Sequence, residues 1–127
     1  MAFSARPFLM FTGEANAAMQ LYVGLFADSR IVDVERRPDG KVMRALFEIC
    51  GQQIMCSDSP VEHAFTFTPS SSIFVDCESV DELERVFSAL EKDGQVLMPL
   101  GNYGFSERFG WLNDRFGVSW QLNLQTV

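Results

Sequence analysis

Few residues in this sequence could act as nucleophiles or as acid–base groups near neutral pH. The cysteines are Cys50, Cys56 and Cys77, and the single histidine is His63. A cysteine nucleophile needs an activating base, and His63 follows Cys56 by seven residues, so a Cys–His pair is one hypothesis. The alternative that we favour is three reduced, partly buried thiols, because an odd number of irregularly spaced cysteines does not indicate a disulfide framework.

Other candidates lie further along the chain. Glu107 could act as a general base in a dry cleft, and His63 could shuttle a proton or donate a hydrogen bond at the mouth of a cleft. Phe109 and Trp111 share the strand face of Glu107, and an aromatic wall suits an apolar or planar ligand. Each candidate also has a structural interpretation: Glu107 as a solvated strand residue, His63 as a loop or dimer-contact residue, and the aromatic pair as core.

Periodicity predicts the elements that position these residues. In the first half we expect strands over 6–12, 30–37, 41–50 and 52–57, and a helix over 14–26 with Thr12 or Gly13 as its N-cap. In the second half we expect strands over 72–77, 95–100, 105–114 and 118–124, and a helix that ends at Gly94. The residues Ser79 to Glu82 match a capping box at the start of that second helix.

Both halves therefore have the order βαβββ, with Gly51 and Gly117 at equivalent turns. This internal repeat predicts an α+β domain over residues 1–127, made of modules 6–57 and 72–127 joined by a linker, 58–71. Half a chain buries too small a core to be stable alone, so we expect the two modules to pair around a shared cleft.

The strand period assigns faces within this arrangement. Trp120 and Leu122 are expected to face the helix, and so is Cys56 in the equivalent strand of the first half. Gln121 and Met55, which occupy equivalent positions, are expected to face the cleft.

Composition excludes several classes of function. The net charge is −7, so the chain lacks the basic excess expected of a protein that binds nucleic acid or anionic membranes. No apolar run approaches the roughly 18–20 residues that span a bilayer, and the N-terminus does not resemble a signal peptide. We therefore expect a cytoplasmic protein.

Several segments resemble those of a known superfamily: Pro7 to Phe11, Ala18 to Phe26, Asp28-Ser29, Gly51-Gln52, Phe65 to Phe67, and Trp111 to Leu122. On these segments the chain resembles the vicinal-oxygen-chelate superfamily of glyoxalase and the bleomycin-resistance proteins. It is most similar to the PhnB-like group, labelled 3-demethylubiquinone-9 3-methyltransferase. The resemblance implies paired βαβββ modules that form a cupped mixed sheet, and a homodimer.

The metal enzymes of this superfamily hold a divalent ion at four cleft positions, which the resemblance places near Pro7, Met55, Ser72 and Gln121. Proline offers no side-chain ligand, Met55 is a soft ligand and Ser72 a weak one, so we expect neither a metal nor another cofactor. Ser72 and Gln121 could instead hydrogen-bond a ligand where the relatives hold metal.

These observations predict a metal-free protein that binds a small aromatic or apolar molecule in its cleft, with no nucleic-acid or membrane partner. The alternative is an enzyme of unassigned type, using His63 or Glu107 or performing the methyl transfer of the family label. The chain lacks the Gly-rich strand-to-helix turn of common methyl-donor folds, which favours the binding protein.

Overall fold

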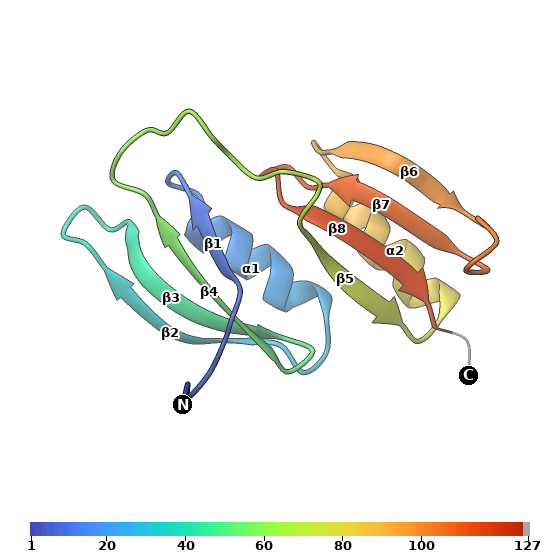
Figure 1. The fold of residues 1–127 in the computed structure, drawn as a ribbon, viewed down its shortest axis with the longest axis horizontal. Helices are drawn as coiled ribbons and strands as arrows, with labels where there is room; N and C mark the ends of the chain where they lie inside the picture. The colour runs from blue at the N-terminus through green and yellow to red at the C-terminus, as the bar shows by residue number, and fades with distance from the viewer. Residues whose placement is uncertain (126–127) are drawn as a thin grey trace. The chain divides into compact units, whose positions relative to one another are not determined.

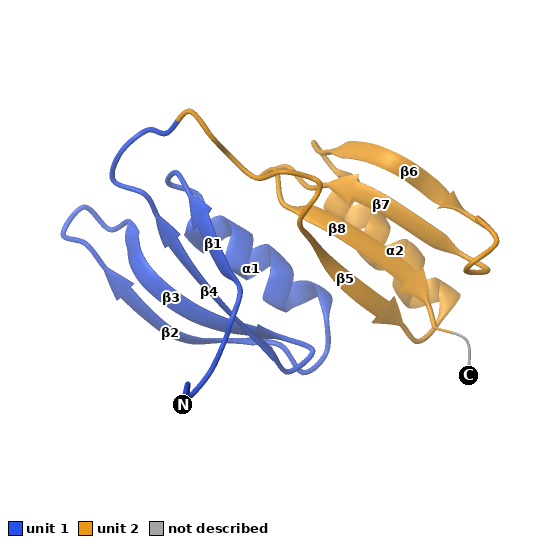
Figure 2. Cartoon of the chain, viewed as in Figure 1, with its two compact units in different colours: residues 1–63 blue, residues 64–127 orange. Residues whose placement is uncertain are grey.

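The computed structural model describes residues 1–125 and divides them into two compact units, one ending at His63 and the other beginning at Ala64 (Figure 2). Each unit is a four-stranded mixed sheet with one α-helix against one face (Figure 1). Neither helix of the described chain is long and apolar enough to cross a membrane. The α+β class and the βαβββ order predicted from the repeat are confirmed.

Unit 1 contains β1 (Phe8–Phe11), α1 (Ala15–Leu25), β2 (Arg30–Arg36), β3 (Val42–Ile49) and β4 (Gln52–Asp58). Its strand order is β1-β4-β3-β2, with β1 parallel to β4 and the other pairs antiparallel. The parallel pair forms because α1 carries the chain back before β2, whereas short turns join the antiparallel strands.

Unit 2 contains β5 (Ser72–Cys77), α2 (Val80–Glu91), β6 (Gln95–Gly101), β7 (Phe109–Asn113) and β8 (Ser119–Leu124). Its order is β5-β8-β7-β6, again with the parallel pair at β5 and β8. The register repeats as well: Phe8 lies opposite Met55 in unit 1, and Phe74 lies opposite Gln121 in unit 2.

The helix-facing side of each sheet is the hydrophobic core. Tyr22, Phe47 and Ile54 are almost fully buried in unit 1, and Trp120 and Leu122 are fully buried in unit 2. Full burial of such a side chain contributes about 1.5–3 kcal/mol, so these residues fix which face of each strand meets the helix. The opposite face of each sheet is then free to present other side chains.

The first helix starts differently from the prediction. Glu14 is the N-cap and makes no side-chain cap bond, so neither Thr12 nor Gly13 has that role. Instead Asp58 Oδ1 accepts hydrogen bonds from the backbone N–H groups of Gly13 (2.8 Å) and Ala15 (2.9 Å). A carboxylate at a helix N-terminus is also favoured by the helix dipole. Asp58 belongs to β4, which therefore extends past the predicted end of the first module.

The second helix starts as the capping box predicts. Ser79 Oγ accepts from the backbone N–H of Glu82 at 3.1 Å. The Glu82 carboxylate accepts in return from the N–H of Glu78, one residue before the expected donor. These contacts satisfy amide groups that the first turn leaves without a helical partner.

One predicted strand starts too early, and a second strand departs from strict alternation. Strand β7 begins at Phe109 rather than at residue 105, so Glu107 lies in the preceding loop and does not share a strand face with Trp111. Gly104 has a φ of +93°, and Ser106 Oγ accepts from the N–H of Arg108, which closes a turn there. In β3 a register shift buries Val42 and exposes Met43, where strict alternation predicts the reverse.

Replacing Asp58 tests the importance of its contacts. Asp58→Ala leaves the N–H groups of Gly13, Ala15 and Val42 without their acceptor, and should lower the free energy of unfolding by about 3 kcal/mol in urea titrations. The matched control is Asp39→Ala, which removes an exposed carboxylate that accepts one N–H, from Lys41. Equal losses for the two variants would contradict this role.

Candidate functional site

The side of each sheet that its helix leaves uncovered is called here the open face. In unit 1 the middle row of the open face consists of Asp33, Leu46, Met55 and Phe8, which are cross-strand partners on β2, β3, β4 and β1. Residues directly opposite one another on neighbouring strands point to the same side of a sheet. This row therefore runs from a carboxylate at one edge, over two half-buried apolar side chains, to an exposed phenyl ring.

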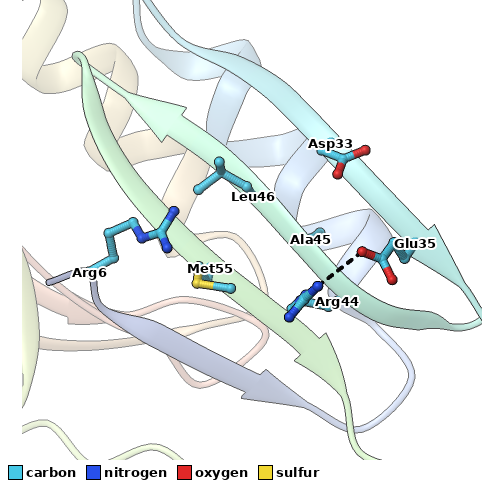
Figure 3. Close-up of a pocket in the computed structure, with 7 residues that line it drawn as sticks. All are labelled: Arg6, Asp33, Glu35, Arg44, Ala45, Leu46 and Met55. Carbon is cyan, nitrogen blue, oxygen red and sulfur yellow. Dashed lines mark hydrogen bonds and ion pairs between the residues drawn. The ribbon is translucent and has the colours of Figure 1, made fainter. Parts of the chain in front are cut away.

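A pocket of about 270 Å³ lies on this open face (Figure 3). Its lining consists of Arg6, Asp33, Glu35, Arg44, Ala45, Leu46 and Met55. Leu46 and Met55 form an apolar floor, with Arg6 on one side of it and the β2 carboxylates on the other (Figure 3). Arg44 Nη2 pairs with Glu35 Oε1 at 3.1 Å. The volume suits a small molecule rather than a large planar one.

The open face of unit 2 has a different character at equivalent positions. Gln121 lies between Trp111 on β7 and Phe74 on β5, which are its cross-strand partners. Gln121 and Trp111 are half-buried, and Phe74 is 54% exposed. Within residues 1–125 the Gln121 amide makes no hydrogen bond. The arrangement presents one polar group between two aromatic rings, which is a suitable frame for a planar ligand with a polar edge.

Next to Gln121, a hydrogen-bond network occupies the hydroxyl groups. Ser119 Oγ lies 2.6 Å from Ser72 Oγ and accepts from Trp111 Nε1 at 2.8 Å. The Pro69 carbonyl accepts from Ser72 Oγ at 3.3 Å. Ser119 is only 1% exposed although it lies on the open face. The network fixes the orientation of the Trp111 indole and leaves Ser72 engaged inside the protein.

An aromatic cluster covers the other end of this open face. Phe109 is buried beneath Phe74, Tyr103 and Phe105, with ring centroids 6.3, 6.2 and 5.0 Å away. Phe105 is 68% exposed, which is unusual for a side chain of its size. Phe109 therefore supports the cluster, whereas Phe74, Tyr103 and Phe105 present apolar surface to solvent.

The two acid–base candidates are exposed loop residues. His63 is exposed, and its Nε2 lies 2.8 Å from Ser59 Oγ. Ser59 Oγ in turn donates to the Val61 carbonyl at 2.9 Å. Glu107 is exposed in the loop before β7. Neither residue lines the pocket of unit 1.

The cysteines have contrasting environments. Cys50 is exposed in the turn between β3 and β4, whereas Cys56 and Cys77 are buried. Burial, with a smaller contribution from the Asp58 carboxylate, raises the pKa of Cys56 to about 12. Its thiol stays protonated near neutral pH, because a thiolate is the reactive form and is strongly disfavoured here. Cys56 thus faces the helix as predicted and is not set up as a nucleophile.

The residues that the resemblance places at metal positions do not offer a set of ligands for a divalent ion. Ser72 already shares a hydrogen bond with Ser119, Met55 supplies a thioether, and Pro7 has no donor atom in its side chain. Among residues 1–125 no three His, Cys, Asp or Glu side chains lie together as metal ligands would. A divalent ion normally needs about three hard or borderline protein ligands, and Gln121 alone does not provide them.

Sequence analysis missed the charged residues of the pocket. Asp33 and Glu35 alternate along β2, and a signal for a shared face was therefore present. Glu35 is half-buried and pairs with Arg44, and this partnership depends on the register of β2 and β3. Arg6 precedes β1 in the structure, so no strand pattern could indicate where its side chain lies.

The chain is similar over nearly its whole length to one known protein family. A family model for 3-demethylubiquinone-9 3-methyltransferase matches residues 4–123, which is nearly the whole chain. The chain belongs to this family. The PhnB protein from Bacillus cereus has a solved structure that is 49% identical, with a TM-score of 0.94 over 96% of this chain and 99% of that one.

Two further relatives extend the comparison. YjdN from Escherichia coli strain K12 is 29% identical over 87 residues, which are 68% of this chain but only 58% of YjdN. The fosfomycin resistance protein FosX from Listeria monocytogenes shares the fold, with a TM-score of 0.62 at 15% identity over 100% of this chain and 96% of that one. The family model and the Bacillus cereus structure confirm the resemblance to the PhnB-like group, and the likeness to FosX shows that the fold is shared.

The cysteine environments predict a simple labelling pattern. At about pH 8 a thiol reagent should modify Cys50 in the folded protein, whereas Cys56, with a pKa of about 12, carries roughly one thiolate in 10⁴ molecules. All three thiols should react after unfolding. The control is Cys50→Ser, which should abolish labelling of the native protein. Rapid modification of Cys56 in that variant would contradict its burial.

Proposed function

We propose that this chain is a metal-free binding protein for a small molecule, held against the open faces of its sheets. The observation that carries the proposal is the unpaired, half-buried amide of Gln121 between Phe74 and Trp111. The polar atoms of Gln121 are not among the buried atoms that lack a partner, so a ligand can replace water at this amide without breaking a protein contact. The aromatic neighbours would then contribute contact area and stacking.

Two surrounding features support this proposal. The network of Ser72 and Ser119 holds the Trp111 indole in place, so its ring is ordered before a ligand arrives. A preorganised side chain loses little entropy on binding. Phe109 similarly supports Phe74 from beneath. In unit 1, Met55 at the position equivalent to Gln121 offers a polarizable apolar contact.

The proposal includes a homodimer in the cytoplasm. Phe8, Phe74 and Phe105 are between 53% and 68% exposed, which leaves apolar surface that a second copy would cover. A dimer would also shield an open-face ligand from water. Sedimentation of the purified protein tests this part of the proposal separately from ligand binding.

Binding can be tested with a library of planar aromatic compounds, by thermal shift and by tryptophan fluorescence. Trp111 is half-buried on the open face whereas Trp120 is fully buried, so a ligand there should change the emission of Trp111. The change should disappear in Trp111→Phe. Gln121→Leu should weaken binding about fivefold to tenfold through loss of one hydrogen bond, with little change in stability.

The matched control is Gln52→Leu, which replaces an exposed glutamine of unit 1. A ligand that binds both variants as it binds the natural protein would contradict the site. A stoichiometric divalent ion in the purified protein, whose removal abolishes binding, would contradict the metal-free proposal.

The second candidate function is the methyl transfer described for the family, which the match over residues 4–123 favours. S-adenosylmethionine should then raise the melting temperature in proportion to the logarithm of its concentration. The alternative to a binding protein is an enzyme, and it can also be a metal-free enzyme that uses His63 or Glu107 as its acid–base group. If His63→Ala and Glu107→Ala leave any detected turnover unchanged, the hypothesis of such a metal-free enzyme is wrong.

A further inference from the structure

We propose that the pocket of unit 1 binds a small zwitterion, with its acidic group at Arg6 and its ammonium group at Asp33. The inference rests on the proposed binding function and assigns a ligand class to a second part of the open faces. The pocket lining carries two arginines and two carboxylates (Figure 3). The pocket is therefore neutral as a whole but divided into separate charged sides.

The pairing of these charges leaves one of each sign available. Arg44 and Glu35 form an ion pair at 3.1 Å and largely neutralise each other. Within residues 1–125 Arg6 and Asp33 form no hydrogen bond or ion pair. The only interaction between side chains of the pocket is that of Arg44 with Glu35 (Figure 3). Arg6 and Asp33 are thus the two groups that a ligand can engage without breaking a contact.

The apolar floor keeps these two groups apart. Asp33 lies on β2, opposite Leu46 on β3, which lies opposite Met55 on β4. Neighbouring strands are about 4.8 Å apart, so the backbones at Asp33 and Met55 are separated by roughly 9–10 Å. Arg6 extends across β4 from the segment before β1 and does not reach Asp33 (Figure 3). A ligand that joins them needs a short apolar chain, and Leu46 and Met55 provide the surface for it.

Simpler ligands suit the pocket less well. An anion at Arg6 alone would leave Asp33 without a counter-charge, and a cation at Asp33 alone would leave Arg6 without one. Both charged groups are solvated, so each contact contributes modestly and depends on salt. A molecule that contacts both Arg6 and Asp33 gains the free energy of two contacts but loses translational and rotational entropy only once.

The experiment compares 6-aminohexanoate with hexanoate and with hexylammonium, whose chains match but which carry one charge each. Binding is followed by NMR titration of the backbone amides of Leu46 and Met55. The zwitterion should bind at least about threefold more tightly than either single-charge probe, and the advantage should fall with added salt. β-Alanine, which is too short to join the two groups, should lose the advantage.

Variants assign each charge to its residue. Arg6→Gln should weaken the binding of 6-aminohexanoate and of hexanoate about threefold and leave the binding of hexylammonium unchanged. Asp33→Asn should weaken the binding of hexylammonium and leave that of hexanoate unchanged. The controls Lys92→Gln and Glu91→Gln make the same charge changes on α2 and its end in unit 2, outside the pocket lining. They should leave all three affinities unchanged.

The inference is overturned if the three probes bind equally, if the control variants act like the pocket variants, or if no probe shifts the two amides at millimolar concentration. None of these results affects the test of the proposed function, which depends on Gln121 and Trp111 in unit 2. Conversely, failure of the Gln121→Leu test leaves a zwitterion-specific response of Arg6 and Asp33 fully interpretable.

Discussion

The buried carboxylate of Asp58 is the interaction on which the first unit depends most. It is 2% exposed, and its two oxygens accept from the backbone of Gly13, Ala15 and Val42. A buried charge is costly unless hydrogen bonds satisfy it, and here one side chain joins the end of β4 to the start of α1 and the start of β3. Because β1 and β4 are parallel neighbours, this junction also fixes the position of the chain that leaves β1 for the helix.

The second unit reaches a similar solution with a different residue. Asp114 Oδ1 accepts from the backbone of Phe116 and Val118, and Oδ2 accepts from Trp120 Nε1. The carboxylate thereby orders the turn between β7 and β8 and holds the largest residue of the core. None of these three hydrogen bonds involves the open face. The exposed Phe74 on the open face is positioned by this framework, whereas Ser119 and Phe109 on the same face are buried and form part of it.

The internal repeat predicted the element order, and strand periodicity predicted the faces of Trp120 and Cys56, whose burial follows from a two-residue period. The start of β7 was predicted four residues too early, because a turn around Gly104 and Ser106 precedes the strand, which begins at Phe109. The Asp58 cap could not be predicted from a local pattern, since its donors are 43 and 45 residues away. The position of Arg6 was likewise beyond sequence reasoning, because it lies outside any regular element and its place depends on tertiary structure.

The two open faces show what the duplication leaves unconstrained. Equivalent positions carry Met55 and Gln121 on the strand next to the parallel edge, and Leu46 and Trp111 on the strand beside it. Helix-facing positions remain apolar in both units because any polar substitution there would lose buried contacts. The open face of unit 1 carries charged side chains at its edges, whereas that of unit 2 carries aromatic ones, so the two faces differ where the cores agree. The similarity of the cores thus follows from packing against the helices, whereas no helix imposes an equivalent constraint on the side chains of the open faces.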